Sequence, residues 1–152
     1  MSVHCKIGSS SVRPINGYGP QECDQSSKKV EFFTAFESAI KSATLNDECI
    51  CAELDANSKI TMENLASDPH HISGNGQLLM EVVNRNSLIV VNSTSKCFGT
   101  ITRLRKTKHS DEKSAIDFFI VCQRFFKLII SLEIDEERKF ILTKYSTRIG
   151  SK

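Results

Sequence analysis

Asp55 and Asn57 are the side chains of this sequence best placed to do chemistry. They follow a short apolar run, Cys49–Ala52, which is typical of a buried strand that brings polar groups to one end of a sheet. Because side chains alternate along a strand, a spacing of two predicts that both point to the same side. A carboxylate beside an amide can handle a phosphate or a metal-bound water. Both residue types also favour turns, and from these residues alone a turn is the simpler interpretation.

Tyr18 lies in a segment that indicates the end of a strand. Ser11–Ile15 alternates weakly, and Asn16–Gln21 then carries two glycines and a proline, a composition that turns a strand into a loop. We therefore expect Tyr18 within the turn, where it is free to face a cleft.

The elements that position these groups follow from hydrophobic periodicity. Apolar residues at spacings of three and four from Val30 to Ala43 predict a helix of about four turns with a core-facing stripe. A second helix is expected over Asn75–Asn86, followed by a continuous apolar strand at Leu88–Asn92. Further strands are expected at 98–103, 114–122, 128–134 and 140–143. Helices alternating with strands in this way predict an α/β layered fold.

Composition sets wider limits on function. The 152 residues are 39% hydrophobic and 25% charged, which suits one soluble globular domain, and a net charge of +2 does not by itself indicate a nucleic-acid partner. The sequence shows no membrane-length apolar run and no secretory h-region near its start, so we expect an intracellular protein, cytoplasmic or nuclear. The six cysteines contain no C-x-x-C pair, which favours reduced, free thiols over a zinc site.

Four motifs, in the right order, resemble those of the endonuclease/exonuclease/phosphatase superfamily. Asn16–Gln21 is similar to its N-x-Y-x-P-Q motif, and Leu54–Lys59 is similar to its G-D-F-N-A-K segment. Asn75–Leu79 with Leu88–Ser93 resembles the helix and strand that follow, and Ser114–Phe118 resembles its S-x-I-D-Y strand. The resemblance covers about residues 11 to 121. It is nearest to the endonuclease domain of non-LTR retrotransposons and the craniofacial-development-like proteins related to them.

The resemblance implies a fold and a chemistry. The fold is a partial four-layer α/β sandwich, two sheets packed face to face with helices outside, over residues 11–145, with flexible termini at 1–10 and 146–152. The chemistry is magnesium-dependent hydrolysis of phosphodiesters, with DNA as the partner. Asp55 would act on the attacking water or leaving group, Asn57 and Tyr18 would contact the phosphate, and Asp117 would orient a catalytic histidine.

A run of basic residues has a counterpart near the DNA in the endonucleases that the sequence resembles. Its members occupy four of the seven positions from 103 to 109 and correspond to a hairpin near the DNA in the family's endonucleases: Arg103, Arg105, Lys106 and Lys108. Contact with phosphates is one interpretation. A solvated hairpin tip, balanced by the two acidic residues that follow, is the other, and both stay open.

The sequence also departs from the family pattern. The S-D-H segment with the catalytic histidine, and the first half with its metal-binding glutamate, have no counterpart here, and Leu54 replaces a glycine. We therefore expect a truncated second half of the domain, a catalytically incomplete fragment of a DNA endonuclease that holds no assigned metal ligand. A non-catalytic remnant that binds nucleic acid or protein is the alternative. An exposed inner sheet face, including Leu88–Val91, predicts self-association or a need for the missing half.

Overall fold

The computed structural model describes residues 5–60, 72–106, 111–135 and 145–149. Along the chain the elements are β1 (Cys5–Ile7), β2 (Ser10–Tyr18), α1 (Ser26–Leu45), β3 (Cys49–Asp55), α2 (Gly74–Arg85), β4 (Leu88–Val90), the short 3-10 helix η1 (Val91–Ser93), β5 (Cys97–Phe98), β6 (Arg103–Lys106), β7 (Asp111–Ser114), β8 (Asp117–Cys122), α3 (Gln123–Phe126), β9 (Ile129–Ile134) and β10 (Tyr145–Ile149).

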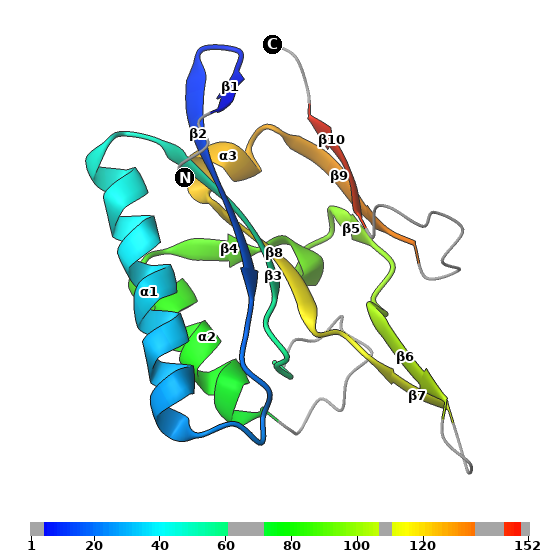
Figure 1. Ribbon diagram of the computed structural model, residues 1–152. Helices are drawn as coiled ribbons and strands as arrows, with labels where there is room; N and C mark the ends of the chain where they lie inside the picture. Colours follow the sequence, from blue (N-terminus) through cyan, green and yellow to red (C-terminus); the bar gives the residue numbers. More distant parts are fainter. Residues whose placement is uncertain (1–4, 61–71, 107–110, 136–144, 150–152) are drawn as a thin grey trace.

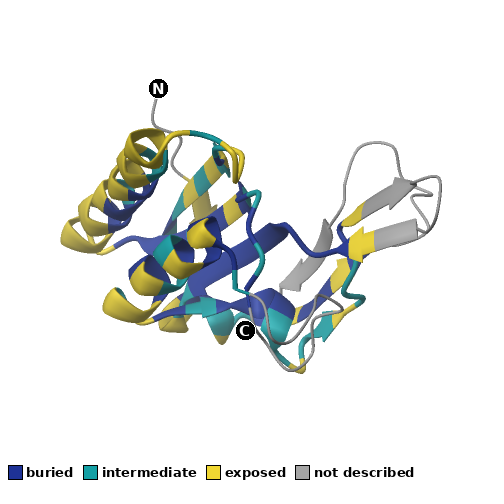
Figure 2. Ribbon diagram, turned by 90° about the horizontal axis from the view of Figure 1, so that it is seen from below, coloured by how far each residue is buried: buried dark blue, intermediate teal, exposed yellow. Residues whose placement is uncertain are grey.

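A five-stranded sheet organises the molecule, with strand order β1-β2-β3-β8-β4. β2 and β3 run parallel, and β8 pairs antiparallel with both β3 and β4. The long connections between these strands carry α1 and α2, which lie beside each other along the sheet (Figure 1). Seen from below, both helices turn exposed residues outward and buried residues toward the strands (Figure 2). The predicted α/β layering is confirmed.

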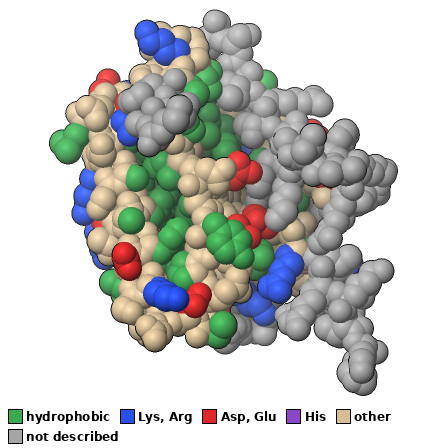
Figure 3. Space-filling model, viewed as in Figure 1, with side chains coloured by type: hydrophobic (Ala, Val, Ile, Leu, Met, Phe, Trp, Pro, Cys, Tyr) green, Lys and Arg blue, Asp and Glu red, His purple; other side chains and the backbone are tan. Residues whose placement is uncertain are grey.

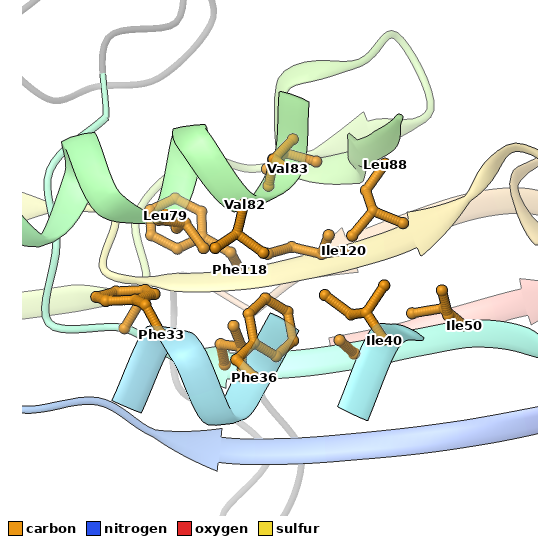
Figure 4. Close-up of a cluster of buried hydrophobic side chains, with 14 of the residues drawn as sticks. Phe33, Phe36, Ile40, Ile50, Leu79, Val82, Val83, Leu88, Phe118 and Ile120 are labelled. Atoms are coloured by element: carbon orange, nitrogen blue, oxygen red, sulfur yellow. The ribbon is translucent and has the colours of Figure 1, made fainter. Parts of the chain in front are cut away.

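The helix-covered face of the sheet holds the larger hydrophobic core. Phe33, Phe36 and Ile40 of α1 meet side chains from α2 and from the middle of the sheet, as the close-up in Figure 4 shows. The spacing predicted for α1 is therefore confirmed, and the helix extends further than expected in both directions. Val30, which opens the predicted stripe, is the exception: it is 53% exposed and lies outside the core.

The opposite face of the sheet is covered at one end by α3 and β9. Phe119 and Val121 of β8 pack there against Phe125 of α3 and Leu132 of β9, in a second cluster of buried apolar side chains. β9 belongs to a separate three-stranded sheet with the order β10-β9-β5. Two sheets with a core between them and helices on the outer face make the predicted partial α/β sandwich.

The apolar strand expected at Leu88–Asn92 is shorter than predicted. β4 ends at Val90, and the chain continues into η1. Leu88, Val90 and Val91 are 8%, 3% and 0% exposed, so the reason offered for self-association at this strand is wrong. Self-association stays a prediction. Phe98 and Ile130 on the smaller sheet are large apolar side chains that are exposed, and they could take part in it.

Two predicted strands are each divided in the structure. The stretch 98–103 splits into β5 and β6, because Gly99 has a φ of +88°, a left-handed conformation that interrupts a strand. The stretch 114–122 splits into β7 and β8, with the Thr102 hydroxyl accepting hydrogen bonds from the backbone N–H groups of Ile116 and Asp117 at the break. The strand expected at 140–143 lies outside the described residues.

Two strands lie within or overlap the segments predicted to be flexible termini, and the predicted domain limits stay a prediction. β1, within residues 1–10, pairs antiparallel with the start of β2. β10 pairs antiparallel with β9 and extends to Ile149, beyond the domain end expected at 145. All six cysteines are free. No helix in the described part of the chain combines the length and apolarity needed to cross a membrane.

Candidate functional site

Three of the four predicted catalytic residues stand in one row across the sheet. The strand register pairs Tyr18 of β2 with Asp55 of β3, and Asp55 with Asp117 of β8. Residues paired in this way point to the same face of a sheet. Their strand neighbours Leu54 and Phe118 belong to the core under α1 and α2, so the row faces the opposite side. We call Tyr18, Asp55, Asp117 and the adjacent Asn57 the polar row.

Asp55 and Asp117 place two carboxylates directly opposite each other on neighbouring strands. Asp117 is only 4% exposed, and Asp55 is half-buried. Like charges in this arrangement destabilise a sheet, so packing alone does not favour the pair. The backbone of Asp117 is held on both sides: its N–H donates to the Thr102 hydroxyl at 3.1 Å, and its carbonyl accepts from Asn92 Nδ2 at 3.2 Å.

Asn57 reaches the row by a different route from the one predicted. β3 ends at Asp55, and Asn57 has a φ of +44°, so strand alternation does not apply to it. Its N–H donates to Asp55 Oδ1 at 3.3 Å, and its Nδ2 donates to the Gly19 carbonyl at 2.8 Å. The turn considered as the alternative is therefore the observed geometry, and it directs the amide toward the end of β2.

Tyr18 is the last residue of β2 rather than part of the following turn, which corrects its predicted position. The pairing of β2 with β3 continues just beyond it, where the Gly19 N–H donates to the Asp55 carbonyl at 2.7 Å. The Tyr18 side chain is 68% exposed, and its hydroxyl accepts a hydrogen bond from Gln21 Nε2 at 3.1 Å. Tyr18 thus presents a phenol to solvent at the rim of the sheet.

The beginning of α2 ties the two strand ends together. Ser73 caps the helix, its hydroxyl accepting from the Gly76 N–H. The fully buried Asn75 donates from Nδ2 to the Pro20 carbonyl at 2.7 Å and to the Asn57 carbonyl at 3.3 Å. One amide therefore holds the loop after β2 and the turn after β3 in a single arrangement.

Glu22 provides the charge on the other side of this junction. Partial burial works against its ionisation, but hydrogen bonds from Ser73, the Asn75 N–H and Lys29 outweigh that effect and hold its pKa below the ordinary value. The Asn75 N–H lies 2.8 Å from Glu22 Oε1, and Lys29 Nζ lies 3.1 Å from Oε2. Glu22 is thus an anion at the N-terminus of α2, where the helix dipole favours one.

A cleft of about 270 Å³ opens beside the polar row. Asn57, Ser58 and Lys59 line it from the turn after β3, and Arg103 lines it from the start of β6. Sequence reasoning missed Ser58 and Lys59, although both stand inside the Leu54–Lys59 motif. In the view of Figure 3, acidic side chains lie near the middle and on the left of the molecule, and basic ones lie at its top, along its left edge and in its lower part.

The predicted DNA-binding run is placed only in part. β6 and β7 form an antiparallel hairpin that projects away from the five-stranded sheet (Figure 1). Arg103 begins β6, and its side chain is exposed beside the cleft. Arg105 and Lys106 lie further along β6, and Lys108 lies outside the described residues.

The magnesium that the resemblance implies can be tested against the available ligands. Among the residues that the structure describes, no three acidic, histidine or cysteine side chains gather closely enough to hold a metal ion. The polar row offers two carboxylates. These residues do not by themselves fit a magnesium site.

Comparison with solved structures identifies the fold. The chain superposes with a TM-score of 0.67 on the endonuclease domain of TRAS1, a telomere-specific non-LTR retrotransposon, at 14% identity over 99% of this chain and 63% of that one. The TM-score is also 0.67 with NExo, a 3' phosphatase from Neisseria bound to a product DNA hairpin, at 13% identity over 99% of this chain and 65% of that one.

These two structures have folds of the endonuclease/exonuclease/phosphatase type, and the resemblance in fold drawn from the sequence is confirmed. The chain spans less than two thirds of the length of each. No protein-family model matches the sequence, and a search of curated proteins found no significant match.

Proposed function

We propose that this chain, which has the fold of endonuclease/exonuclease/phosphatase enzymes, binds a phosphodiester of DNA at the polar row and so carries part of a phosphodiesterase site. The observation that supports this most strongly is the strand register that aligns Tyr18, Asp55 and Asp117. One of the two similar solved structures is a retrotransposon endonuclease domain and the other is a 3' phosphatase bound to product DNA, which supports DNA as the substrate class.

Asn57 and Tyr18 supply donors for the phosphate oxygens. One N–H of the Asn57 amide is held by the Gly19 carbonyl, which fixes the orientation of the second N–H before any ligand arrives. The Tyr18 hydroxyl accepts its hydrogen bond from Gln21, so its own proton is available for donation. Donors fixed in advance cost little reorganisation when they stabilise a negative charge.

Recognition of a phosphate also calls for a cation near its oxygens. Arg103 lines the same cleft as Asn57 and provides a guanidinium, which suits planar recognition of phosphate. Arg105, Lys106 and Lys108 follow Arg103 in the sequence and would add to this positive charge. We therefore propose that DNA passes from the row onto the β6–β7 hairpin.

The 152-residue chain is expected to bind DNA without hydrolysing it. By the resemblance, Asp55 acts on the attacking water and Asp117 orients a histidine, but no histidine follows Asp117 in this sequence. A missing acid–base group typically lowers a rate by about 10²–10⁴-fold. The proposal for the chain is thus a phosphate-binding site in which catalysis is incomplete.

Two assays test this proposal. Purified chain incubated with supercoiled plasmid in magnesium or manganese should leave the plasmid intact. Reproducible nicking that disappears in both Asp55→Ala and Asn57→Ala would show instead that the site is catalytically complete. For binding, Asn57→Ala should weaken affinity for a short duplex about tenfold at low salt, as expected for loss of a hydrogen bond to a charged group.

The exposed Asn84 of α2 offers a matched control, and Asn84→Ala should bind as the wild type does. The hairpin is tested separately by replacing its four cations together with alanine. The slope of log K against log salt should then fall by up to about four, because each lost phosphate contact removes close to one counterion. Absence of DNA binding by the wild type even at low salt would contradict the proposed function.

A further inference from the structure

The cleft beside Asn57 contains two cations from distant parts of the sequence. Lys59 comes from the turn after β3, and Arg103 comes from the first position of β6. Ile116 is the one apolar residue among the described residues that line the cleft, and the others carry amide, hydroxyl or charged groups. A polar hollow of this size with two cations suits a small anion.

The charges of the cleft leave positive charge uncompensated. Neither Lys59 nor Arg103 forms an ion pair with any residue within the described ranges. Glu22 is the only carboxylate in the described lining, and Lys29 pairs with it at 3.1 Å while the N-terminus of α2 faces it. The carboxylate is therefore already balanced, and the two cations remain available to a ligand.

Ser58 is an independent sign that a ligand belongs here. It lines the cleft and is only 1% exposed, yet its Oγ has no hydrogen-bond partner among the described residues. A buried hydroxyl without a partner costs free energy, so such a group calls for an explanation. An acceptor oxygen delivered by a bound anion would supply the missing partner.

We propose that this cleft is a second phosphate subsite, in which Lys59 and Arg103 pair with a phosphate group and Ser58 donates to one of its oxygens. The inference rests on the proposed function in one respect: the phosphate is taken to be the one next to the phosphate at Asn57 in a nucleic-acid backbone. Lys59 and Ser58 then fix the position of the strand relative to the polar row.

Inorganic phosphate is the direct probe, because its binding does not depend on DNA. The ¹⁵N-labelled 152-residue chain would be titrated with sodium phosphate at constant ionic strength while amide shifts are followed. We expect saturable shifts at Ser58, Lys59 and Arg103, with affinity reduced about tenfold in both Lys59→Gln and Arg103→Gln.

Lys127→Gln provides the charge-matched control. Lys127 is exposed and follows α3, which begins at the opposite end of β8 from Asp117. This variant should bind phosphate as the wild type does. The subsite would be refuted if no saturable shift occurs, or if Lys127→Gln weakens binding as much as Lys59→Gln does.

Ser58→Ala distinguishes a ligand contact from a structural role. Removal of an unpartnered buried hydroxyl should leave the thermal midpoint unchanged or raised while phosphate affinity falls several-fold. Lower stability with unchanged phosphate affinity would show that the hydroxyl serves the fold alone and would overturn its part in the subsite.

Duplex DNA binding, measured in the same variants, separates the two proposals. If Asn57→Ala weakens DNA binding and Lys59→Gln does not, the subsite is wrong and the proposed function stands. If phosphate binding depends on Lys59 but no variant or wild-type chain binds DNA, the subsite stands and the proposed function is wrong. If Asn57→Ala and Lys59→Gln both weaken DNA binding, the result supports the subsite and the proposed function together.

Discussion

The two faces of the five-stranded sheet show how one set of strands serves two purposes. On the face toward α1 and α2, Leu54 and Phe118 are 1% and 0% exposed and join a continuous apolar core. On the other face, the next residues along the same strands are Asp55 and the facing Asp117. Because side chains alternate along a strand, a core residue and a candidate site residue are direct neighbours in the sequence.

The two faces are also held by different forces. Burial of apolar area fixes the helix-covered face, and it is non-directional and proportional to area. The polar row is fixed by hydrogen bonds with residues that lie elsewhere in the sequence: Thr102 accepts one, and Asn92 and Asn75 donate others. Substitutions on the first face should therefore change stability most, and substitutions around the row should change binding as well.

The largest effect is expected on the helix-covered face. Phe118→Ala should lower the free energy of unfolding by about 3–5 kcal/mol, because a fully buried aromatic side chain leaves a cavity. Phe98→Ala, at a strand position that is 61% exposed, should change it by only about 0.5 kcal/mol. Urea denaturation of both variants makes the comparison, and equal effects would contradict the placement of the core.

A smaller effect is expected where α2 meets the turn that carries Asn57. A Cβ at Gly76 would lie 2.0 Å from the Lys59 carbonyl oxygen, so Gly76→Ala must displace the turn or the helix. We expect a loss of about 1–3 kcal/mol in stability, together with weaker DNA binding.

Gly74→Ala is the matched control for this substitution, because among the described residues its Cβ would approach Glu22 Oε2, at 3.4 Å, and Lys29 Nζ, at 3.9 Å, without a clash. The stability of the Gly74→Ala variant should therefore change little. If Gly76→Ala leaves both stability and DNA binding unchanged, the close contact between α2 and the turn does not hold the polar row.

At Asn57 itself the effect of the backbone can be separated from that of the side chain. Its φ of +44° is readily adopted by glycine and disfavoured for alanine. Asn57→Ala should therefore be about 1 kcal/mol less stable than Asn57→Gly in thermal or urea unfolding. Both should bind DNA equally weakly, and recovery of binding in Asn57→Gly would refute a role for the amide.

The smallest effect concerns pH and Glu22. Because its folded-state pKa lies below the ordinary value of 4.5, its contribution to stability is present above about pH 4.5 and is lost as the pH falls through the folded-state pKa. The difference in urea midpoint between the wild type and Glu22→Gln should therefore shrink between pH 6 and pH 3. A difference that grows toward pH 3 would contradict this sign.

The sequence predicts the helix-covered face better than the polar end, for a physical reason. Periodicity from Phe33 to Ala43 and the apolar start of β3 are local signals, and burial acts on them directly. The positive φ of Asn57 depends on contacts from Gly19 and Asp55, and the cleft joins Lys59 to Arg103 across the fold. Such contacts carry no periodic signal.

The resemblance to a known superfamily identifies candidate site residues that hydrophobic periodicity does not. Motifs in separate segments single out Tyr18, Asp55 and Asp117, and the strand register places these three residues in one row. Their catalytic and phosphate-binding roles remain predictions. The burial of Val30 and the end of β4 are predicted wrongly, because a hydrophobic pattern does not show where contact with the core ends.

The most direct test of the central claim is a titration of the ¹⁵N-labelled chain with a short DNA duplex at low salt, followed by amide and Asn side-chain shifts. The proposed site predicts that the largest saturable changes occur at Tyr18, Asp55, the Asn57 side chain and Asp117, with further changes at Arg103. Changes absent from the polar row, whether confined to the β6–β7 hairpin or spread evenly over basic surface residues, would contradict it.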